Sequence, residues 1–256
     1  MSSKQDRRDP LHCMPVAEKF ISVNGEGPLA GTPAAFIRFV GCNLACSYCD
    51  TAWACNTSCE CEKLDAWQLC EWVANTGMHA VTVTGGEPLI HPLVGDLLRL
   101  LVSGDGAREI PFTLPSDLTV EVETNGAVNL QKMFTLLNFL PKEQADRIRF
   151  TVDYKLPSSG MEDEMCLQNY ARLRSMDTVK FVVGSEADLE RTVQVADDLE
   201  LWGRVPVLVS PVAGSIKPSA IKPSAVAQFL IDNKLVYARL QLQLHKILWP
   251  GVDRGV

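Results

Sequence analysis

Basic side chains are in short supply in this sequence. Its 256 residues include 24 Lys and Arg against 31 Asp and Glu, which gives a formal net charge of −7 at pH 7. Proteins that bind the phosphate backbone of a nucleic acid usually carry a basic surplus or a basic stripe. We therefore expect no nucleic-acid partner.

Long hydrophobic runs are missing as well. No segment approaches the roughly 20 consecutive apolar residues of a membrane span, and the polar residues 1–10 lack the apolar core of a signal peptide. We expect no membrane partner and a cytoplasmic protein, in which thiols stay reduced. The nine cysteines then indicate metal or redox chemistry rather than a disulfide framework.

Short β-branched segments alternate with segments of helical periodicity along most of the chain. The segments predicted as strands are residues 34–40, 79–84, 118–123, 148–154, 178–183, 205–210 and 237–244. The segments predicted as helices are residues 64–75, 92–102, 130–140, 165–174, 187–201 and 224–233. Such alternation is typical of a parallel sheet with right-handed crossover connections.

The predicted fold class is α/β, with mostly parallel strands in a partial, open (β/α) barrel. The predicted strands are too few for a closed eight-unit barrel, which needs roughly 250 residues. A flat doubly wound sheet is the alternative. We expect residues 15–256 to form this single domain and residues 1–14 to form a loose tail.

Unusual polar clusters follow the ends of the predicted strands. In chain order they are the cysteine triplet 42–49, then residues 84–88, 123–126, 153–155, 210–211 and 245–246. The carboxyl ends of parallel strands open on one face of the sheet, where ligands bind. We expect these clusters to converge on one site.

The cysteine triplet is a C-x3-C-x2-C run of Cys42, Cys46 and Cys49. Thiolates are soft ligands that suit iron–sulfur clusters, zinc or copper(I). A closed site would need a fourth ligand, so three cysteines leave one iron of a cluster open to another molecule. The alternatives are a zinc site completed by His12, Cys13 or Cys55, and three unrelated buried cysteines.

Two motifs together resemble the radical S-adenosylmethionine (SAM) superfamily. The first is the triplet with an aromatic residue, Tyr48, before its last cysteine, and the second is the TGGEP segment at residues 84–88, similar to the GGEP motif. The resemblance implies a partial barrel of the radical SAM type, a [4Fe-4S] cluster on the three cysteines, and SAM bound to the open iron.

Within that superfamily the chain resembles the 7-carboxy-7-deazaguanine synthases over residues 15–256. The similar segments are residues 20–27 (FISVNGEG), 41–44 (GCNL), 49–51 (CDT), 123–126 (ETNG), 210–212 (SPV) and 243–246 (QLHK). The resemblance implies a carbon–nitrogen lyase of queuosine and deazapurine biosynthesis. Such an enzyme contracts the ring of 6-carboxy-5,6,7,8-tetrahydropterin, releases ammonia and re-forms SAM.

The resemblance also assigns site residues. For SAM they are Tyr48, Asp50, Gly86, Glu87, Asp153, Lys155 and Ser210. For the pterin they are Val23, Asn24, Gly25, Glu26, Arg38, Thr84, His245 and Val256. Thr51 matches a magnesium site, which would assemble only with substrate oxygens because one hydroxyl is a weak ligand.

The chemistry of the individual side chains supports some of these roles and leaves alternatives for others. Arg38 interrupts an apolar strand and needs a partner, either the substrate carboxylate or a structural ion pair. Glu87 could accept from the SAM ammonium or be an exposed acid, and Glu26 could accept from the pterin amidine. Family relatives carry Gln where this chain has Asn24.

Further expectations concern the protein partners, the remaining cysteines and the competing functions. Family analogy implies an external electron donor of the flavodoxin or ferredoxin type and a homodimer. Cys55, Cys59 and Cys61 are predicted to be reduced surface thiols, with Cys70 on the buried face of a helix. A glycyl-radical activating enzyme and a zinc-binding interaction module are the competing hypotheses.

Overall fold

A computed structural model describes residues 12–103, 112–213 and 220–256, so most of the predicted N-terminal tail lies outside the described residues. Its centre is one nine-stranded sheet in the order β3-β1-β2-β4-β5-β6-β7-β8-β9. The strands are β1 Met14–Val23, β2 Pro33–Phe39, β3 Glu62–Leu64, β4 Ala80–Gly85, β5 Thr119–Thr124, β6 Ile148–Tyr154, β7 Thr178–Val183, β8 Val207–Pro211 and β9 Ala238–Leu240. From β2 to β9 all neighbours are parallel, whereas β1 is antiparallel to β2 and β3.

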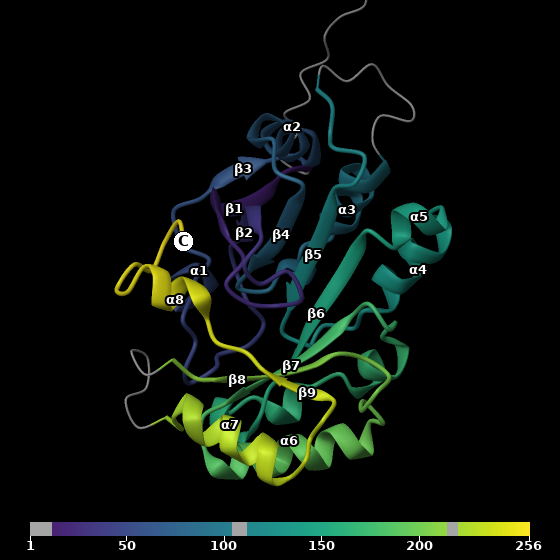
Figure 1. Cartoon of the computed structure of the whole chain (residues 1–256). Coiled ribbons are helices and arrows are strands. Elements are labelled where there is room, and N and C mark those ends of the chain that lie inside the picture. Colours follow the sequence, from purple (N-terminus) through teal and green to yellow (C-terminus); the bar gives the residue numbers. More distant parts are fainter. Residues whose placement is uncertain (1–11, 104–111, 214–219) are drawn as a thin grey trace, which may run out of the picture.

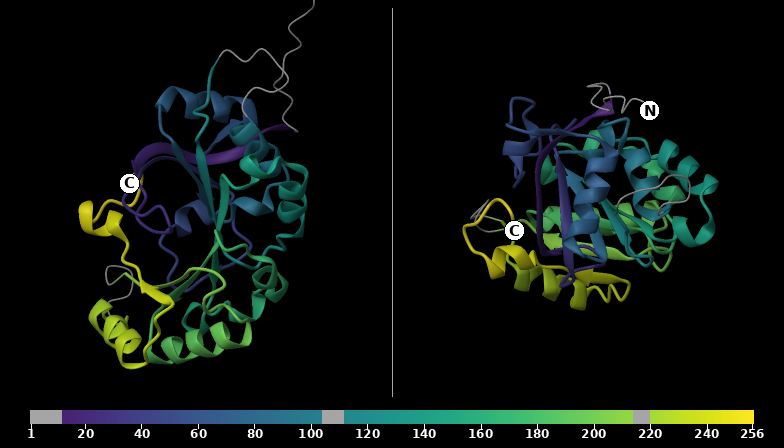
Figure 2. Two further views of the ribbon diagram at one scale, coloured as in Figure 1. Left: turned by 45° about the vertical axis from the view of Figure 1, so that its right-hand side comes forward. Right: turned by 90° about the horizontal axis from the view of Figure 1, so that it is seen from above.

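Most of the helices surround the outer side of this curved sheet, whereas α1 and α8 lie beside the C-terminal end of the chain (Figures 1 and 2). The helices are α1 Ala52–Cys55, α2 Ala66–Thr76, α3 Val94–Ser103, α4 Gln131–Phe139, α5 Lys142–Ala145, α6 Glu186–Asp198, α7 Pro223–Asp232 and α8 Leu244–Leu248. Short 3-10 turns are η2 Pro88–Ile90, η3 Pro157–Ser159, η4 Glu162–Glu164 and η5 Leu167–Arg172. No helix in the described ranges is long and apolar enough to cross a membrane.

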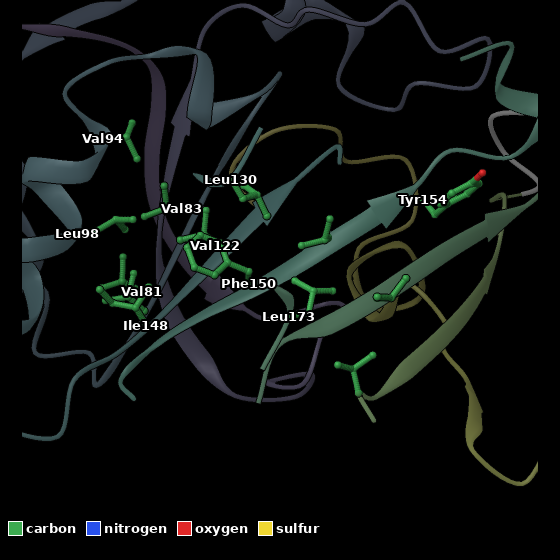
Figure 3. Close-up of a cluster of buried hydrophobic side chains, with 14 of the residues drawn as sticks. Val81, Val83, Val94, Leu98, Val122, Leu130, Ile148, Phe150, Tyr154 and Leu173 are labelled. Atoms are coloured by element: carbon green, nitrogen blue, oxygen red, sulfur yellow. The ribbon is translucent and has the colours of Figure 1, made fainter. Parts of the chain in front are cut away.

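The hydrophobic core lies between the sheet and these helices. Figure 3 shows Val94 and Leu98 of α3 facing Val81 and Val83 of β4, and all four side chains are buried completely. Burial of such aliphatic side chains contributes about 1.5–3 kcal/mol each relative to exposure. The core therefore holds the outer face of the sheet and leaves the inner face for other groups.

The sheet confirms the partial, open barrel, because it ends at two edges, β3 and β9. Each of the predicted strands overlaps one parallel strand of the sheet. The strands β6, residues 148–154, and β7, residues 178–183, have the predicted bounds. The antiparallel β1 and β3 were not predicted.

Two predicted elements differ from the structure. Within residues 165–174 the chain forms the 3-10 turns of η5, Leu167–Arg172, rather than an α-helix. This segment is tied to residues 126–130, because Asn169 donates through Nδ2 to the carbonyls of Gly126 and Val128 and accepts from Leu130 N. The predicted strand at 237–244 is shortened to β9, and His245 lies on α8 instead of at a strand end.

Candidate active site

The inner face of the sheet carries polar side chains in a regular pattern. Successive residues of a strand point to opposite faces, so Val120 and Val122 of β5 enter the core while Glu121 and Glu123 point the other way. The neighbouring strands repeat this alternation with Arg38, Thr84, Asp153 and Lys180. The alternation turns the inside of the open barrel into a polar surface.

A cavity of about 600 Å³ occupies this inner side, within the range usual for small-molecule sites. Its walls come from the inner face of the sheet, the cysteine loop and the C-terminal segment. All but three of the predicted site residues line it; those that do are Val23, Gly25, Glu26, Arg38, Cys42, Cys46, Tyr48, Cys49, Asp50, Thr51, Thr84, Gly86, Asp153, Lys155, His245 and Val256. The exceptions are Asn24, Glu87 and Ser210, which are buried behind the wall.

The cysteine loop connects β2 to α1 and is fastened at several points. Ser47 Oγ donates to the carbonyl of Ser158 at 2.7 Å, and the Tyr48 hydroxyl donates to the carbonyl of Val182 at 3.1 Å. A Cβ on Gly86 would lie 2.2 Å from the carbonyl oxygen of Gly41, so only glycine permits the TGGEP segment to approach this loop. The two motifs that resemble those of the radical SAM superfamily are thus in direct contact.

The thiols of this loop have unequal acidity. Interaction with the neighbouring Cys55 thiol lowers the pKa of Cys42 and that of Cys49 to about 6, whereas burial raises the pKa of Cys46. Thiolates are the ligand form. Three soft donors on one anchored loop, facing a cavity, fit an iron–sulfur cluster with an open position.

Cys55 itself corrects a prediction. It ends α1 and lines the cavity with its Sγ 3.9 Å from that of Cys49, so the prediction of a surface thiol was wrong for this residue. Thr51 begins the same helix, but its hydroxyl makes no capping hydrogen bond and lies 3.8 Å from Cys49 Sγ. Cys70 is buried on α2, as predicted.

Glu87 lies beneath the cavity rather than in its wall. Its carboxylate accepts hydrogen bonds from Leu89 N at 2.9 Å, Thr124 Oγ1 at 2.9 Å and Asn125 N at 2.6 Å. Burial raises the pKa of this carboxyl to about 7. Glu87 therefore orders the ends of β4 and β5; its predicted contact with the SAM ammonium stays a prediction, as the structure does not expose its side chain to the cavity.

Asp153 and Lys155, predicted to contact SAM, form an ion pair at the end of β6. Burial opposes both charges, yet Lys155 and Lys180 together lower the pKa of Asp153. Burial would also lower the pKa of Lys155, but the charge of Asp153 raises it above its ordinary range. Both groups thus stay ionised beside the cysteine loop.

The predicted substrate loop, residues 24–27, is held by the C-terminal segment. Gln241 accepts from Gly27 N and donates to Gly27 O, both at 3.0 Å, and Leu244 N donates to Gly25 O at 3.0 Å. A Cβ on Gly25 would lie 2.1 Å from Nδ1 of His245, so that imidazole packs on the loop. Sequence reasoning missed Gln241, because it is one of several polar residues that alternate with leucines in residues 239–244 and nothing in the sequence distinguishes it from Arg239 or Gln243.

Beneath this loop lie groups that hold its side chains. Thr82 Oγ1 donates to Asn24 Oδ1 at 2.6 Å, while Asn24 Nδ2 is buried without a hydrogen-bond partner. Ser210 Oγ donates to Glu26 Oε1 at 3.2 Å, and Lys180 Nζ donates to Glu26 Oε2 at 3.2 Å. Lys180 was also missed, although its charge interrupts an apolar strand just as that of Arg38 does.

Arg38 forms the structural ion pair, and its predicted contact with the substrate carboxylate stays a prediction. Its Nε donates to Glu18 Oε1 of β1 at 2.8 Å, which is the structural ion pair. The same residue lines the cavity, on the side of Glu26 and His245. A guanidinium has five N–H donors, so the ion pair leaves donors for a ligand carboxylate.

The C-terminal segment closes one side of the site. In Figure 1 this yellow segment passes close to α1, and the Arg254 guanidinium lies over the Trp53 ring, 4.0 Å from its centroid. Val252, Asp253 and Val256 contribute to the cavity wall. Residues from both ends of the described chain therefore meet around one cavity.

The partial barrel, the anchored cysteine loop and the facing TGGEP segment define a radical SAM protein, and residues 36–154 match the family described as the Radical SAM superfamily. The chain belongs more narrowly to the 7-carboxy-7-deazaguanine synthases. It is 41% identical to the 7-carboxy-7-deazaguanine synthase of Clostridium acetobutylicum over 94% of this chain and 98% of that protein. The synthase of Leptospira interrogans is 30% identical over 94% of this chain and 97% of its own length.

A solved structure agrees with this fold. The crystal structure of QueE from Escherichia coli superimposes with a TM-score of 0.63 at 22% identity, covering 94% of this chain and 99% of that one. At that identity the match supports the fold alone. Family membership confirms the predicted resemblance and displaces the activating-enzyme and zinc-module alternatives.

Proposed function

We propose that this chain converts 6-carboxy-5,6,7,8-tetrahydropterin to 7-carboxy-7-deazaguanine with release of ammonia. The observation that supports this most is the shared cavity. It joins the thiols of the cysteine loop to Glu26 and Arg38, a carboxylate and a guanidinium suited to the amidine edge and the carboxylate of one pterin. Membership of the synthase family supports the same reaction.

Cys42, Cys46 and Cys49 would hold the cluster, and Gly86, Asp153 and Lys155 would surround SAM. A bound [4Fe-4S] cluster and SAM would supply the radical hydrogen-abstraction chemistry. The protein residues supply position and a dry cavity. Ser47 and Tyr48 fasten the loop that carries these thiols to Ser158 and Val182.

The substrate would lie between the sheet and the C-terminal segment. Glu26 offers two carboxylate oxygens that Lys180 and Ser210 hold in place. Val23 and Phe36 add apolar surface to the wall, and His245 closes the loop side. A pterin ring held in this way is oriented by polar groups at its edges and by apolar contact on its faces.

We further propose that Thr51 is a magnesium ligand together with substrate oxygens. The hydroxyl supports this role because it faces the cavity and is not used in capping. Mg²⁺ retains several waters and tolerates few protein ligands. Turnover of the wild type and of Thr51→Val is measured at a series of magnesium concentrations. We expect Thr51→Val to turn over much more slowly than the wild type and to need more magnesium. The same dependence of turnover on magnesium in both proteins would contradict the assignment.

Kinship with the synthases also supports three proposals about context: a cytoplasmic protein, a homodimer, and an electron donor of the flavodoxin or ferredoxin type. Sedimentation equilibrium of the holoenzyme distinguishes monomer from dimer. Reduction of the cluster by each purified donor, followed by its EPR signal, identifies which type is competent.

The reaction itself is tested on anaerobically reconstituted enzyme. With a reductant, SAM and 6-carboxytetrahydropterin, we expect ammonia and 7-carboxy-7-deazaguanine in equal amounts, with SAM recycled rather than consumed. An intact cluster that cleaves SAM yet leaves the pterin unchanged would overturn the proposed substrate. Stoichiometric consumption of SAM would instead favour an activating enzyme.

A further inference from the structure

Lys180 joins two carboxylates that belong to different parts of the candidate active site. Its Nζ lies 3.2 Å from Oε2 of Glu26 and 3.4 Å from Oδ1 of Asp153. Glu26 comes from the loop between β1 and β2, and Asp153 from the carboxyl end of β6. The first is proposed to bind the pterin and the second SAM, so one cation serves both subsites.

The sheet fixes the position of this cation. Asp153 and Lys180 are register partners on the adjacent parallel strands β6 and β7, and Lys180 is only 7% exposed. Burial alone would lower the pKa of the amine, but Asp153, Glu26 and Glu123 raise it well above its ordinary value. Lys180 is therefore a permanent positive charge that cannot turn away into bulk solvent.

Each of the two carboxylates has a second partner on its far side. Asp153 pairs through Oδ2 with Lys155, and Glu26 accepts through Oε1 from Ser210 at 3.2 Å. The groups form a continuous series from Ser210 through Glu26, Lys180 and Asp153 to Lys155. A change at one end of such a buried series alters the electrostatics of the next group along it.

We propose that Lys180 couples the two ligands thermodynamically, so that SAM strengthens pterin binding and the pterin strengthens SAM binding to the same degree. The inference rests on the proposed function. Buried between its two carboxylates, Lys180 can still shift toward Glu26 or toward Asp153. A ligand that engages one carboxylate limits this movement and orders the other carboxylate as well, so the second ligand binds a site that is already ordered. Couplings of this kind typically change affinity by roughly 5- to 150-fold.

The test measures binding without turnover. Affinity of 6-carboxytetrahydropterin for the reconstituted, unreduced holoenzyme is determined by anaerobic calorimetry, with and without saturating SAM. In the wild type we expect SAM to tighten the pterin by roughly fivefold or more, and the pterin to tighten SAM by the same factor. In Lys180→Met the factor should fall to about 1, whereas Lys180→Arg, which keeps the charge, should retain most of it.

A matched control is Lys19→Met, which removes the cation of the 2.6 Å Lys19–Glu62 pair outside the cavity lining and should leave the coupling unchanged. If Lys180→Met does not yield folded holoenzyme, Lys180→Gln is compared with Lys180→Arg. Wild-type coupling in the Met or Gln variant overturns the inference, as does an absence of coupling in the wild type. Failure of the pterin to bind wild-type holoenzyme that binds SAM overturns the proposed substrate, and the inference with it.

Discussion

Gln241 binds the backbone of Gly27 with both ends of its side-chain amide, across 214 positions of sequence. The carboxamide accepts from the N–H and donates to the carbonyl of the same residue, each at 3.0 Å. The pair is buried, so loss of one partner leaves polar groups without hydrogen bonds, at a cost of about 1–3 kcal/mol. Beside Gly27 lies Glu26, whose position depends on this arrangement.

Gln241→Leu should therefore weaken substrate binding more than it weakens the fold. We expect the KM for the pterin to rise about tenfold, equivalent to about 1.4 kcal/mol, with an unchanged cluster content. Steady-state kinetics under anaerobic conditions measure this. Gln228→Leu, on the exposed face of α7, is the control, and an equal rise in both variants would contradict a role for the Gln241–Gly27 contact.

Gly27→Ala and Gly31→Ala distinguish the free-energy cost of backbone strain from the cost of a steric collision, because both glycines lie in the same hairpin. Both glycines have positive φ, +74° and +87°, where an L side chain is strained by roughly 1–2 kcal/mol. A Cβ at Gly27 would lie 2.0 Å from Glu121 Oε1, whereas a Cβ at Gly31 meets nothing within 4 Å. We expect Gly31→Ala to lower the free energy of unfolding by the backbone strain alone. Gly27→Ala should lower it by about twice as much or more, because its Cβ also collides with Glu121.

The measurement is the urea midpoint of each anaerobic protein, followed by circular dichroism, together with the pterin KM. Only Gly27→Ala should raise the KM, because only its side chain displaces the floor of the substrate loop. Equal destabilisation by the two substitutions would show that the contact with Glu121 is unimportant.

Glu121 makes stability depend on pH. It is completely buried, accepts from Thr151 Oγ1 at 2.7 Å, and burial together with Glu123 raises the pKa of its carboxyl to about 8. Below the ordinary pKa of 4.5 both folded and unfolded chains are protonated. Between 4.5 and about 8 only the unfolded chain releases the proton, so this contribution to stability is lost as the pH rises through that window.

Glu121→Gln removes that titration. Between pH 5.5 and 8, the free energy of unfolding of the wild type should fall relative to the variant by on the order of 3 kcal/mol. Urea unfolding at the two pH values measures the difference. Glu143→Gln, exposed on α5, should follow the wild type at both; parallel behaviour of Glu121→Gln and the wild type would contradict the prediction.

Cys55 tests how many thiolates the iron requires. Because we assign the cluster to Cys42, Cys46 and Cys49, as the match to the Radical SAM superfamily implies, Cys55→Ala should bind about four irons per chain like the wild type. Cys42→Ala should lose most of its iron, and Cys61→Ala should lose none. Iron analysis after anaerobic reconstitution distinguishes this three-thiolate site from a four-thiolate site. In a four-thiolate site, Cys55→Ala would also lose iron.

The parallel strands were predictable because their signal is local. In residues 178–183 the alternation that places Val179 and Phe181 in the core is visible in the sequence itself. β1 was not predictable in the same way, because Glu18 and Lys19 interrupt its apolar pattern. Their partners, Arg38 and Glu62, lie on other strands, so the sequence of β1 alone gives no reason to expect a strand.

In the candidate site, too, the parts with a local sequence signal were predicted and the parts without one were missed. The cysteine triplet and the TGGEP segment are contiguous motifs, and the structure brings both to one cavity. The parts that were missed, Gln241 and Lys180, act through residues on other strands or loops. Glu87 was recognised by its motif, but its burial depends on hydrogen bonds from β5 and the residue that follows it.

The contact between Gln241 and Gly27 also has a consequence for biosynthesis. A ribosome releases the cysteine loop and the strands behind it long before it releases residue 241, and a domain generally folds as a unit. During synthesis the substrate loop therefore lacks the residue that fixes its backbone until the C-terminal segment has been made. Competence to recognise the pterin is acquired last, when the tail of the polypeptide returns to its first hairpin.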